Sequence, residues 1–357
     1  MGLLDWLNSA KQSPSFKPAY IRIKPENTNE DSKFYSPFSS NQQYFEVVVN
    51  EMYLSYKRKW LTTYDPMVFV TTEFEYAGEK VTMPFVVGPA LISDKKQKLP
   101  EGQGFLFKNT TVAGLHPAKG NAIAITLVLN RLPGDNALRK VLNVVEKVSG
   151  TFSKEFQAIA GGYLKIAGVV LQGMDILTES DEVKAIVGIR DEYGNDDLRP
   201  GYFALVNGED QDFDENKFFV KGKELHYGNN MATCQPFRSD DYVLYSLRSE
   251  TERRDVETLP MFQAWKDINS SLSKIYRKLT DDEKKLYRGQ LFGLGTEMMF
   301  SPDLTEPQAN KLLDEYTAKL EKEIARRDAL SGEEHAAGKS PDEWKSKIER
   351  LSKKLYQ

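Results

Sequence analysis

The sequence predicts an α+β protein: an antiparallel β-sandwich or mixed sheet with an inserted helical pair, followed by a C-terminal helical bundle. Three observations support this fold class. In several short segments before residue 250, apolar and polar residues alternate with the period of a half-buried strand. In residues 135–178, and again after residue 258, apolar residues recur at steps of three and four, the period of an amphipathic helix. Helix-capping sequences recur in the C-terminal part.

The N-terminal segment, residues 1–43, is predicted to be an apolar peptide on a flexible tether. Ser, Asn, Pro and Lys are frequent after residue 8, apart from a short extended candidate at 20–23. The apolar side chains of the peptide are Leu3, Leu4, Trp6 and Leu7. An apolar peptide on a polar tether indicates a docking surface on the body of this chain, on a partner subunit or, with less support, on lipid.

The β-rich body is predicted to span residues 44–250, with the helical insertion at 135–178. Its strands are marked by period-two alternation or by β-branched and aromatic runs. We place them at 45–49, 67–76, 81–87, 122–129, 184–190, 202–206, 217–226 and 242–248. Because strands lie on both sides of the helical pair in the sequence, we expect the pair to cover a sheet of the body.

The C-terminal domain, residues 258–357, is predicted to be a small helical bundle. Three capping boxes mark helix starts, since each has Thr or Ser followed three residues later by Glu or Gln. They are Thr280 to Glu283, Thr305 to Gln308 and Ser340 to Glu343. The apolar stripes of the first and last predicted helices include Trp265, Ile268, Leu272, Trp344 and Ile348.

The tripeptide Gly338-Lys339-Ser340 resembles the end of a phosphate-binding loop, but its surroundings argue against a nucleotide site. The motif needs four residues between its two glycines, and Gly332 lies one residue too far upstream. The preceding segment has a helical pattern instead of a strand pattern, and Pro341 removes a backbone amide. Ser340 is therefore assigned to the cap of the last helix.

Composition makes a nucleic-acid partner unlikely and gives no sign of a cofactor. The 48 Lys and Arg residues are outnumbered by 52 Asp and Glu residues, for a net charge of −4. Residues 56–60 place three cations between two aromatic residues, which suits base stacking but is equally typical of a charged strand edge. A single cysteine excludes an internal disulfide, and the N-terminus has no export-signal pattern, so we expect a cytoplasmic location.

Two groups of side chains are weak candidates for chemistry. His226 and Cys234 are the one close pair that resembles a base and a thiol nucleophile, although a lone Cys is more often a small buried hydrophobe. An acidic loop could gather around Ca²⁺, but an EF-hand needs Gly where Glu215 stands and Glu where Lys221 stands. The candidate metal ligands in this loop are Asp210, Asp212, Asp214 and Glu215. A solvated acidic turn is the favoured interpretation.

Residues 156–177 are long enough to cross a bilayer core, but soluble packing is favoured. Lys165 and Gln172 fall in the middle of the segment, and a central Lys costs about 2.5–3.5 kcal/mol on insertion scales. The small residues of this segment would equally allow close packing between a sheet and a neighbouring element.

The leading hypothesis is a non-catalytic interaction or assembly protein, either a scaffold or a structural protein, that binds a protein partner or itself. The expected contact elements are the N-terminal peptide and the helix faces that carry Trp265 and Trp344. The competing interpretation places those helix faces in an internal core. Two other hypotheses stay open. One is a peripheral membrane-acting protein in which residues 152–177 or the N-terminal peptide engage lipid, with or without Ca²⁺ at residues 210–215. The other is a hydrolase or transferase that uses His226 and Cys234.

Overall fold

The computed structural model describes residues 18–55, 58–59, 62–76, 79–87, 105–119, 123–133, 184–194, 199–208 and 213–329. These residues form three antiparallel sheets and three α-helices, a mixed α+β composition. By their contacts they divide into two compact units. The first unit contains the sheets and extends to Glu250, and the second contains residues 41–44 and the helices from Thr251 onward.

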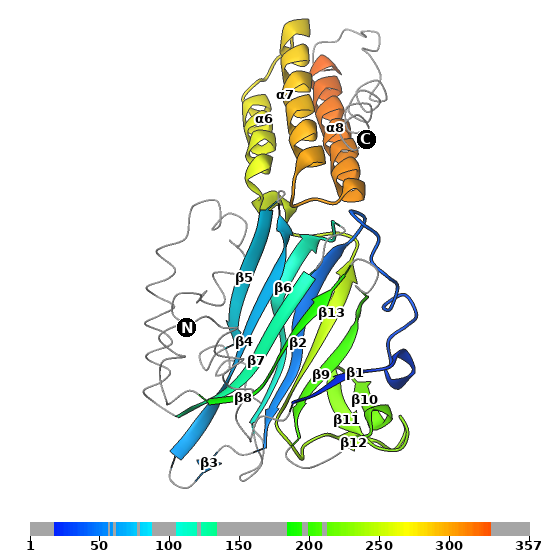
Figure 1. The fold of residues 1–357 in the computed structure, drawn as a ribbon. Helices are drawn as coiled ribbons and strands as arrows, with labels where there is room; N and C mark the ends of the chain where they lie inside the picture. The colour runs from blue at the N-terminus through cyan, green and yellow to red at the C-terminus, as the bar shows by residue number, and fades with distance from the viewer. Residues whose placement is uncertain are drawn as a thin grey trace. The chain divides into compact units, whose positions relative to one another are not determined.

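The first sheet has five strands in the order β1-β9-β13-β2-β6 (Figure 1). Their bounds are Pro18–Arg22 for β1, Gly201–Asn207 for β9, Tyr242–Glu250 for β13, Tyr44–Leu54 for β2 and Phe105–Pro117 for β6. The strand β9 pairs antiparallel with both β1 and β13. All seven residues of β9 are buried, which explains why this strand is almost entirely apolar in sequence.

The second sheet also has five strands, in the order β3-β4-β7-β8 with β5 paired to β4. Their bounds are Arg58–Lys59 for β3, Thr62–Tyr76 for β4, Glu79–Val87 for β5, Ile123–Pro133 for β7 and Lys184–Tyr193 for β8. Tyr76 pairs with Glu79, so two residues connect β4 to β5 in a hairpin.

The third sheet is short and consists of β10 (Phe218–Lys221), β11 (Glu224–Tyr227) and β12 (Gln235–Pro236). The sequence predicts one strand at 217–226, and the structure divides this stretch into a hairpin. Gly222 and Lys223 adopt positive φ angles of 58° and 69°, as a two-residue hairpin turn requires. Two short 3₁₀ helices, η1 (Pro25–Asn27) and η2 (Glu215–Lys217), lie in the same unit.

Side chains of both five-stranded sheets meet in one hydrophobic core. Its members include Phe45, Val47, Val49, Val68, Val70, Leu127, Leu129, Val187, Phe203, Leu205, Val243 and Tyr245. A second cluster joins the opposite side of the first sheet to β10 and β11 through residues such as Tyr202, Leu244, Phe218 and Leu225. The first sheet is therefore buried on both faces.

The strand β2 changes its alternation in the middle. Val49 and Met52 both belong to the shared core, although three positions separate them. Between them, Asn50 and Glu51 both bond to residues of the opposite side of the sheet. One extra residue of this kind is typical of a β-bulge, and it directs two neighbouring polar side chains to the same face.

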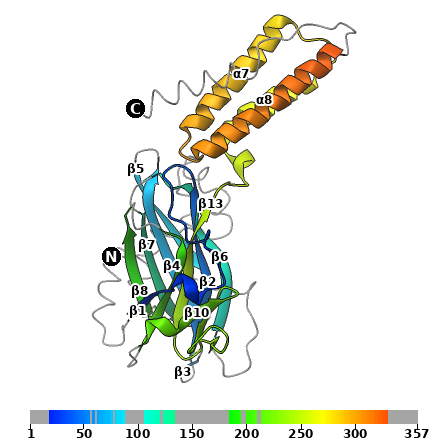
Figure 2. The ribbon, with the colours of Figure 1, turned by 90° about the vertical axis from the view of Figure 1, so that its right-hand side faces the viewer.

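The helical unit contains α6 (Gln263–Ser273), α7 (Asp281–Phe300) and α8 (Glu306–Ala329), preceded by η3 (Val256–Thr258) and η4 (Pro260–Phe262). The helices α7 and α8 lie side by side in both views (Figure 2). Their core contains Trp265, Ile268, Leu272, Leu291, Leu294, Met298, Leu313, Tyr316, Leu320 and Ile324. The predicted apolar stripe of α6 is thus part of the core of its own unit.

The predicted capping boxes have different outcomes. Thr280 accepts from the backbone N–H of Glu283, whose carboxylate accepts from the N–H of Thr280, so this box is confirmed. The box at Thr305 does not form, although α8 begins there. Gln308 instead bonds to the backbone of Arg253, and the N–H of Thr305 donates to the hydroxyl of Tyr44. The third box, at Ser340, lies outside the described residues.

The segment predicted as a flexible tether differs from the structure in its second half. Residues 18–22 form an edge strand on β9, and Ile21 and Ile23 are buried. The side chain of Asn27 donates to the backbone oxygens of Asn216 and Phe218. Alternating apolar residues therefore outweigh the polar composition of this segment. The apolar peptide before it and the helical insertion at 135–178 lie outside the described residues.

Candidate functional site

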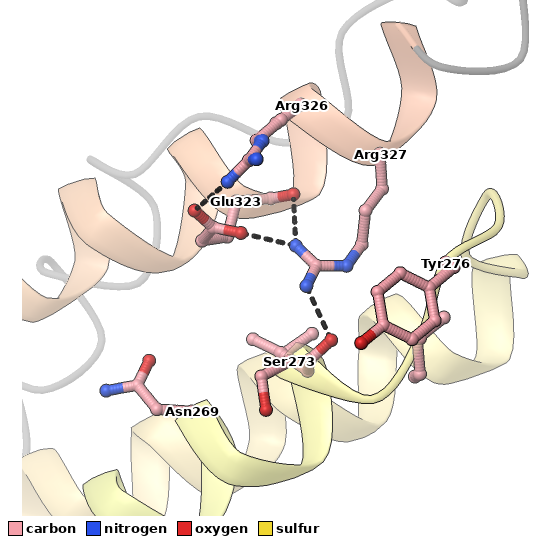
Figure 3. A pocket seen from close by; sticks show the side chains of 8 residues that line it. Asn269, Ser273, Tyr276, Glu323, Arg326 and Arg327 are labelled. Carbon is pink, nitrogen blue, oxygen red and sulfur yellow. Dashed lines mark hydrogen bonds and ion pairs between the residues drawn. The ribbon is translucent and has the colours of Figure 1, made fainter.

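A cavity of about 440 Å³ lies in the helical unit, where the C-terminal ends of α6 and α8 meet (Figure 3). It is lined by Asn269, Leu272, Ser273, Ile275, Tyr276, Glu323, Arg326 and Arg327. We call it the α6–α8 pocket. Its volume lies in the range of small-molecule and side-chain binding sites, and apolar and charged side chains share its wall.

Arg327 fixes the geometry of the α6–α8 pocket. Its guanidinium donates to the backbone oxygen and the carboxylate of Glu323 and, across the pocket, to the backbone oxygen of Leu272. Arg327 therefore adds a side-chain donor to the Leu272 carbonyl in the last turn of α6, which also accepts from the N–H of Ile275. The side chain of Arg327 is only 8% exposed.

Arg327 also carries a donor without a partner. Its Nε atom is buried and makes no hydrogen bond within the part of the chain that the structure describes. Figure 3 shows this nitrogen on the side of the guanidinium that faces Tyr276. A buried donor without an acceptor costs about 1–3 kcal/mol, so an acceptor placed at this position would be stabilised.

Tyr276 is the most exposed large apolar side chain among the described residues, with 89% of its surface accessible. It follows the end of α6, where the N–H groups of Lys274 and Ile275 close the last turn onto Ser271 and Leu272. The next helix cap is at Thr280. The short connection between the two helices therefore holds an aromatic ring at the rim of the α6–α8 pocket.

Positive charge predominates around the α6–α8 pocket. Its lining contains Arg326 and Arg327 against one acid, Glu323. The hydrogen bond from Arg327 lowers the pKa of Glu323. Burial opposes this shift, and the charges of Arg327 and Arg326 add to it. Arg326 is 73% exposed and only reaches Glu323 at 3.6 Å.

Sequence reasoning missed this pocket because its two walls are about fifty positions apart in the chain. A signal for one wall was present in the sequence. Tyr276 lies off the stripe that contains Leu272 and Ile275, in a polar connection with Lys274, Arg277 and Lys278. An aromatic residue among cations between two helices has no place in the core of either helix, so it indicates a contact site.

The His226 and Cys234 pair lacks the geometry of an activated thiol. Cys234 is buried, and its Sγ donates to the backbone oxygen of Met231 at 3.3 Å. His226 lies on β11, with Nδ1 3.1 Å from the backbone oxygen of Glu224. Within the described residues no hydrogen bond joins the thiol to the imidazole, whereas nucleophilic catalysis by a thiol needs such a base.

The acidic loop is only partly described. Asp210 and Asp212 lie outside the described residues. Asp214 caps η2, since its carboxylate accepts from the backbone N–H of Asn216 at 3.1 Å. Glu215 is exposed in the first turn of η2. In the described ranges no three His, Cys, Asp or Glu side chains are grouped closely enough to hold a metal ion.

The predicted contact residues fall into two groups. Trp265 is buried and packs at 4.5 Å between ring centroids against Tyr316 of α8, so it belongs to the core of the helical unit. The other predicted contact residues lie outside the described residues. They are Leu3, Leu4, Trp6, Leu7, Trp344 and Ile348. Of the cations at 56–60, Arg58 and Lys59 form the short strand β3, which pairs with β4 at the end of its sheet.

Membrane insertion finds no support in the described helices, since none is long and apolar enough to span a bilayer. The segment at 156–177 lies outside the described residues. We compared the whole chain with protein-family models, with curated proteins and with solved structures, and none of them matches it. The function must therefore be argued from the site itself.

Proposed function

We propose that this chain is a non-catalytic interaction or assembly protein and that the α6–α8 pocket is one of its contact surfaces. The exposed ring of Tyr276 carries the proposal. An aromatic ring that is 89% exposed gains little from the fold of its own unit, and beside it lie the arginines of the pocket. Tyr and Arg are the residue types enriched where protein partners bind most strongly.

The architecture suits a scaffold. We propose that the two five-stranded sheets pack as a β-sandwich, since their side chains share one core. We propose further that the helices form a bundle that continues beyond residue 329. The helical unit would present the pocket to a partner. A cytoplasmic location fits the single cysteine, whose thiol is buried.

Site-specific photo-crosslinking in producing cells tests the proposal. A benzoylphenylalanine replaces Tyr276 in one version of the full chain, and in a matched version it replaces Leu286, which is 58% exposed on α7. We expect a crosslinked adduct, with a second copy or with another protein, at position 276 and not at 286. Light scattering on the full chain then separates self-assembly from a different partner. Equal crosslinking at both positions, or none at 276, would refute the proposal.

A further inference from the structure

We propose that the α6–α8 pocket binds a short acidic peptide segment of a partner protein, in which a carboxylate lies next to an apolar side chain. This inference rests on the proposed function and specifies its partner. It follows from three features of the pocket: its charge, the apolar part of its lining and the unpartnered donor of Arg327.

The charge of the pocket favours an anionic group. Glu323 already accepts two hydrogen bonds from Arg327, one at its carboxylate and one at its backbone oxygen. Its carboxylate is thus partly neutralised by Arg327, and the 3.6 Å approach of Arg326 is a weak pair on an exposed surface. Arg326 is therefore able to pair with a carboxylate that arrives from outside.

The apolar part of the lining favours a hydrophobic side chain beside that carboxylate. Leu272 and Ile275 line the pocket together with the ring of Tyr276. A volume of about 440 Å³ accommodates one or two side chains but not a folded domain. Because Tyr276 is so exposed, its ring can pack onto a bound side chain without leaving a cavity in the core.

Arg327 supplies the observation that points to an acceptor on the ligand. Three hydrogen bonds to Glu323 and Leu272 hold the guanidinium in place, and Nε stays buried without a partner among the described residues. Because Nε is buried, a carboxylate oxygen reaches it only when the side chains that cover it shift, and it would then satisfy this donor while the other three bonds stay intact. The guanidinium is thus preorganised, which limits the entropy lost on binding.

A peptide fits better than a nucleic acid. The chain has a net charge of −4, and the lining of the pocket offers only Arg326 and Arg327 as cations. Nucleic-acid binding relies on several phosphate contacts from a wider basic surface. A single carboxylate beside an apolar group needs only the charges that this pocket offers.

An array of short immobilised peptides tests the inference with the full-length protein. Each peptide carries Asp or Glu next to Leu, Ile or Phe, and its counterpart carries Asn or Gln instead. Peptides that retain the protein are then titrated by fluorescence anisotropy. The variants are Arg326→Gln and Tyr276→Ser, and Arg254→Gln is the matched control because Arg254 is exposed but precedes the start of α6. Single-stranded oligo(dT) is the competing ligand.

We expect acidic peptides to bind and their amide counterparts to bind about fivefold more weakly. Arg326→Gln should cause a similar loss, Tyr276→Ser a loss of about tenfold, and Arg254→Gln no resolved loss. The inference is overturned if no acidic peptide binds, or if acidic peptides and their amide counterparts bind with equal affinity. It is also overturned if Arg254→Gln loses as much affinity as Arg326→Gln, or if oligo(dT) binds more tightly than the acidic peptides and its binding depends on Arg326. Crosslinking at position 276 without acidic-peptide binding would retain the proposed function and reject this partner class.

Discussion

Glu51 is a fully buried carboxylate that joins the first sheet to the third. Its oxygens accept from the backbone N–H of Leu225 at 2.7 Å, from the hydroxyl of Tyr242 at 2.7 Å and from Arg238 at 2.9 Å. Burial raises the pKa of Glu51, although Arg238 and the hydrogen bonds oppose this effect. A pKa that is higher in the folded than in the unfolded chain means that the folded chain holds the proton more tightly. Glu51 therefore favours folding most at low pH, and this contribution to stability is lost as the pH rises through the raised pKa.

We predict that Glu51→Ala lowers the free energy of unfolding by about 3 kcal/mol, because Arg238, Tyr242 and the Leu225 amide all lose their acceptor. Urea denaturation of the purified variant measures the change. Glu224→Ala is the control, since Glu224 reaches Arg238 only at 3.8 Å and is 30% exposed. It should change stability by no more than about 0.5 kcal/mol. Equal midpoints for the two variants would contradict this account of Glu51.

At the scale of elements, the start of α7 depends on a carboxylate at the surface. The hydrogen bonds from Arg277 and Thr280 lower the pKa of Glu283 from 4.5 to about 2. A lowered pKa means that Glu283 stabilises the fold fully above pH 4.5 and loses this effect as the pH falls toward 2. We predict that Glu283→Gln removes this part of the acid sensitivity. The melting temperature, followed by circular dichroism between pH 6 and 2, should fall less steeply in the variant than in the natural chain.

Elements in which apolar residues recur with one clear period were predictable from the sequence, and elements shaped by tertiary contacts were not. The strands β2, β4 and β7 follow from local alternation. The strand β6 was missed because a polar run, Lys108–Thr111, and Gly114 interrupt its pattern. Gly114 has a φ of +120°, and a Cβ there would lie 2.8 Å from the backbone oxygen of Phe45, so the close approach of β2 requires glycine. No local pattern reveals that neighbour.

The same reason explains the capping box at Thr305 and the missed pocket. Thr305 and Gln308 have the right residue types and spacing, but a tyrosine from far earlier in the chain satisfies the amide of Thr305. The pocket likewise depends on Arg327 reaching the end of α6. Residue spacing shows which groups can bond locally, and only the fold shows which distant group competes for them.

At the scale of the whole molecule, the two units have separate hydrophobic cores. One core contains side chains of both five-stranded sheets, and another contains side chains of α6, α7 and α8. Tyr44 begins β2 but belongs by its contacts to the helical unit, where its hydroxyl accepts from the amide of Thr305 at 3.0 Å. Units with their own cores are expected to open separately.

We therefore predict that Tyr44→Phe and Glu51→Ala act on different units. Tyr44→Phe leaves the Thr305 amide without an acceptor and should destabilise the helical unit by about 2 kcal/mol. Hydrogen exchange read by mass spectrometry should then speed up in peptides of α7 and α8 and stay unchanged in β9 and β13, with the reverse pattern for Glu51→Ala. Tyr276→Phe is the control, because its hydroxyl belongs to an exposed side chain. If either variant accelerates exchange equally in both units, they unfold as one cooperative body.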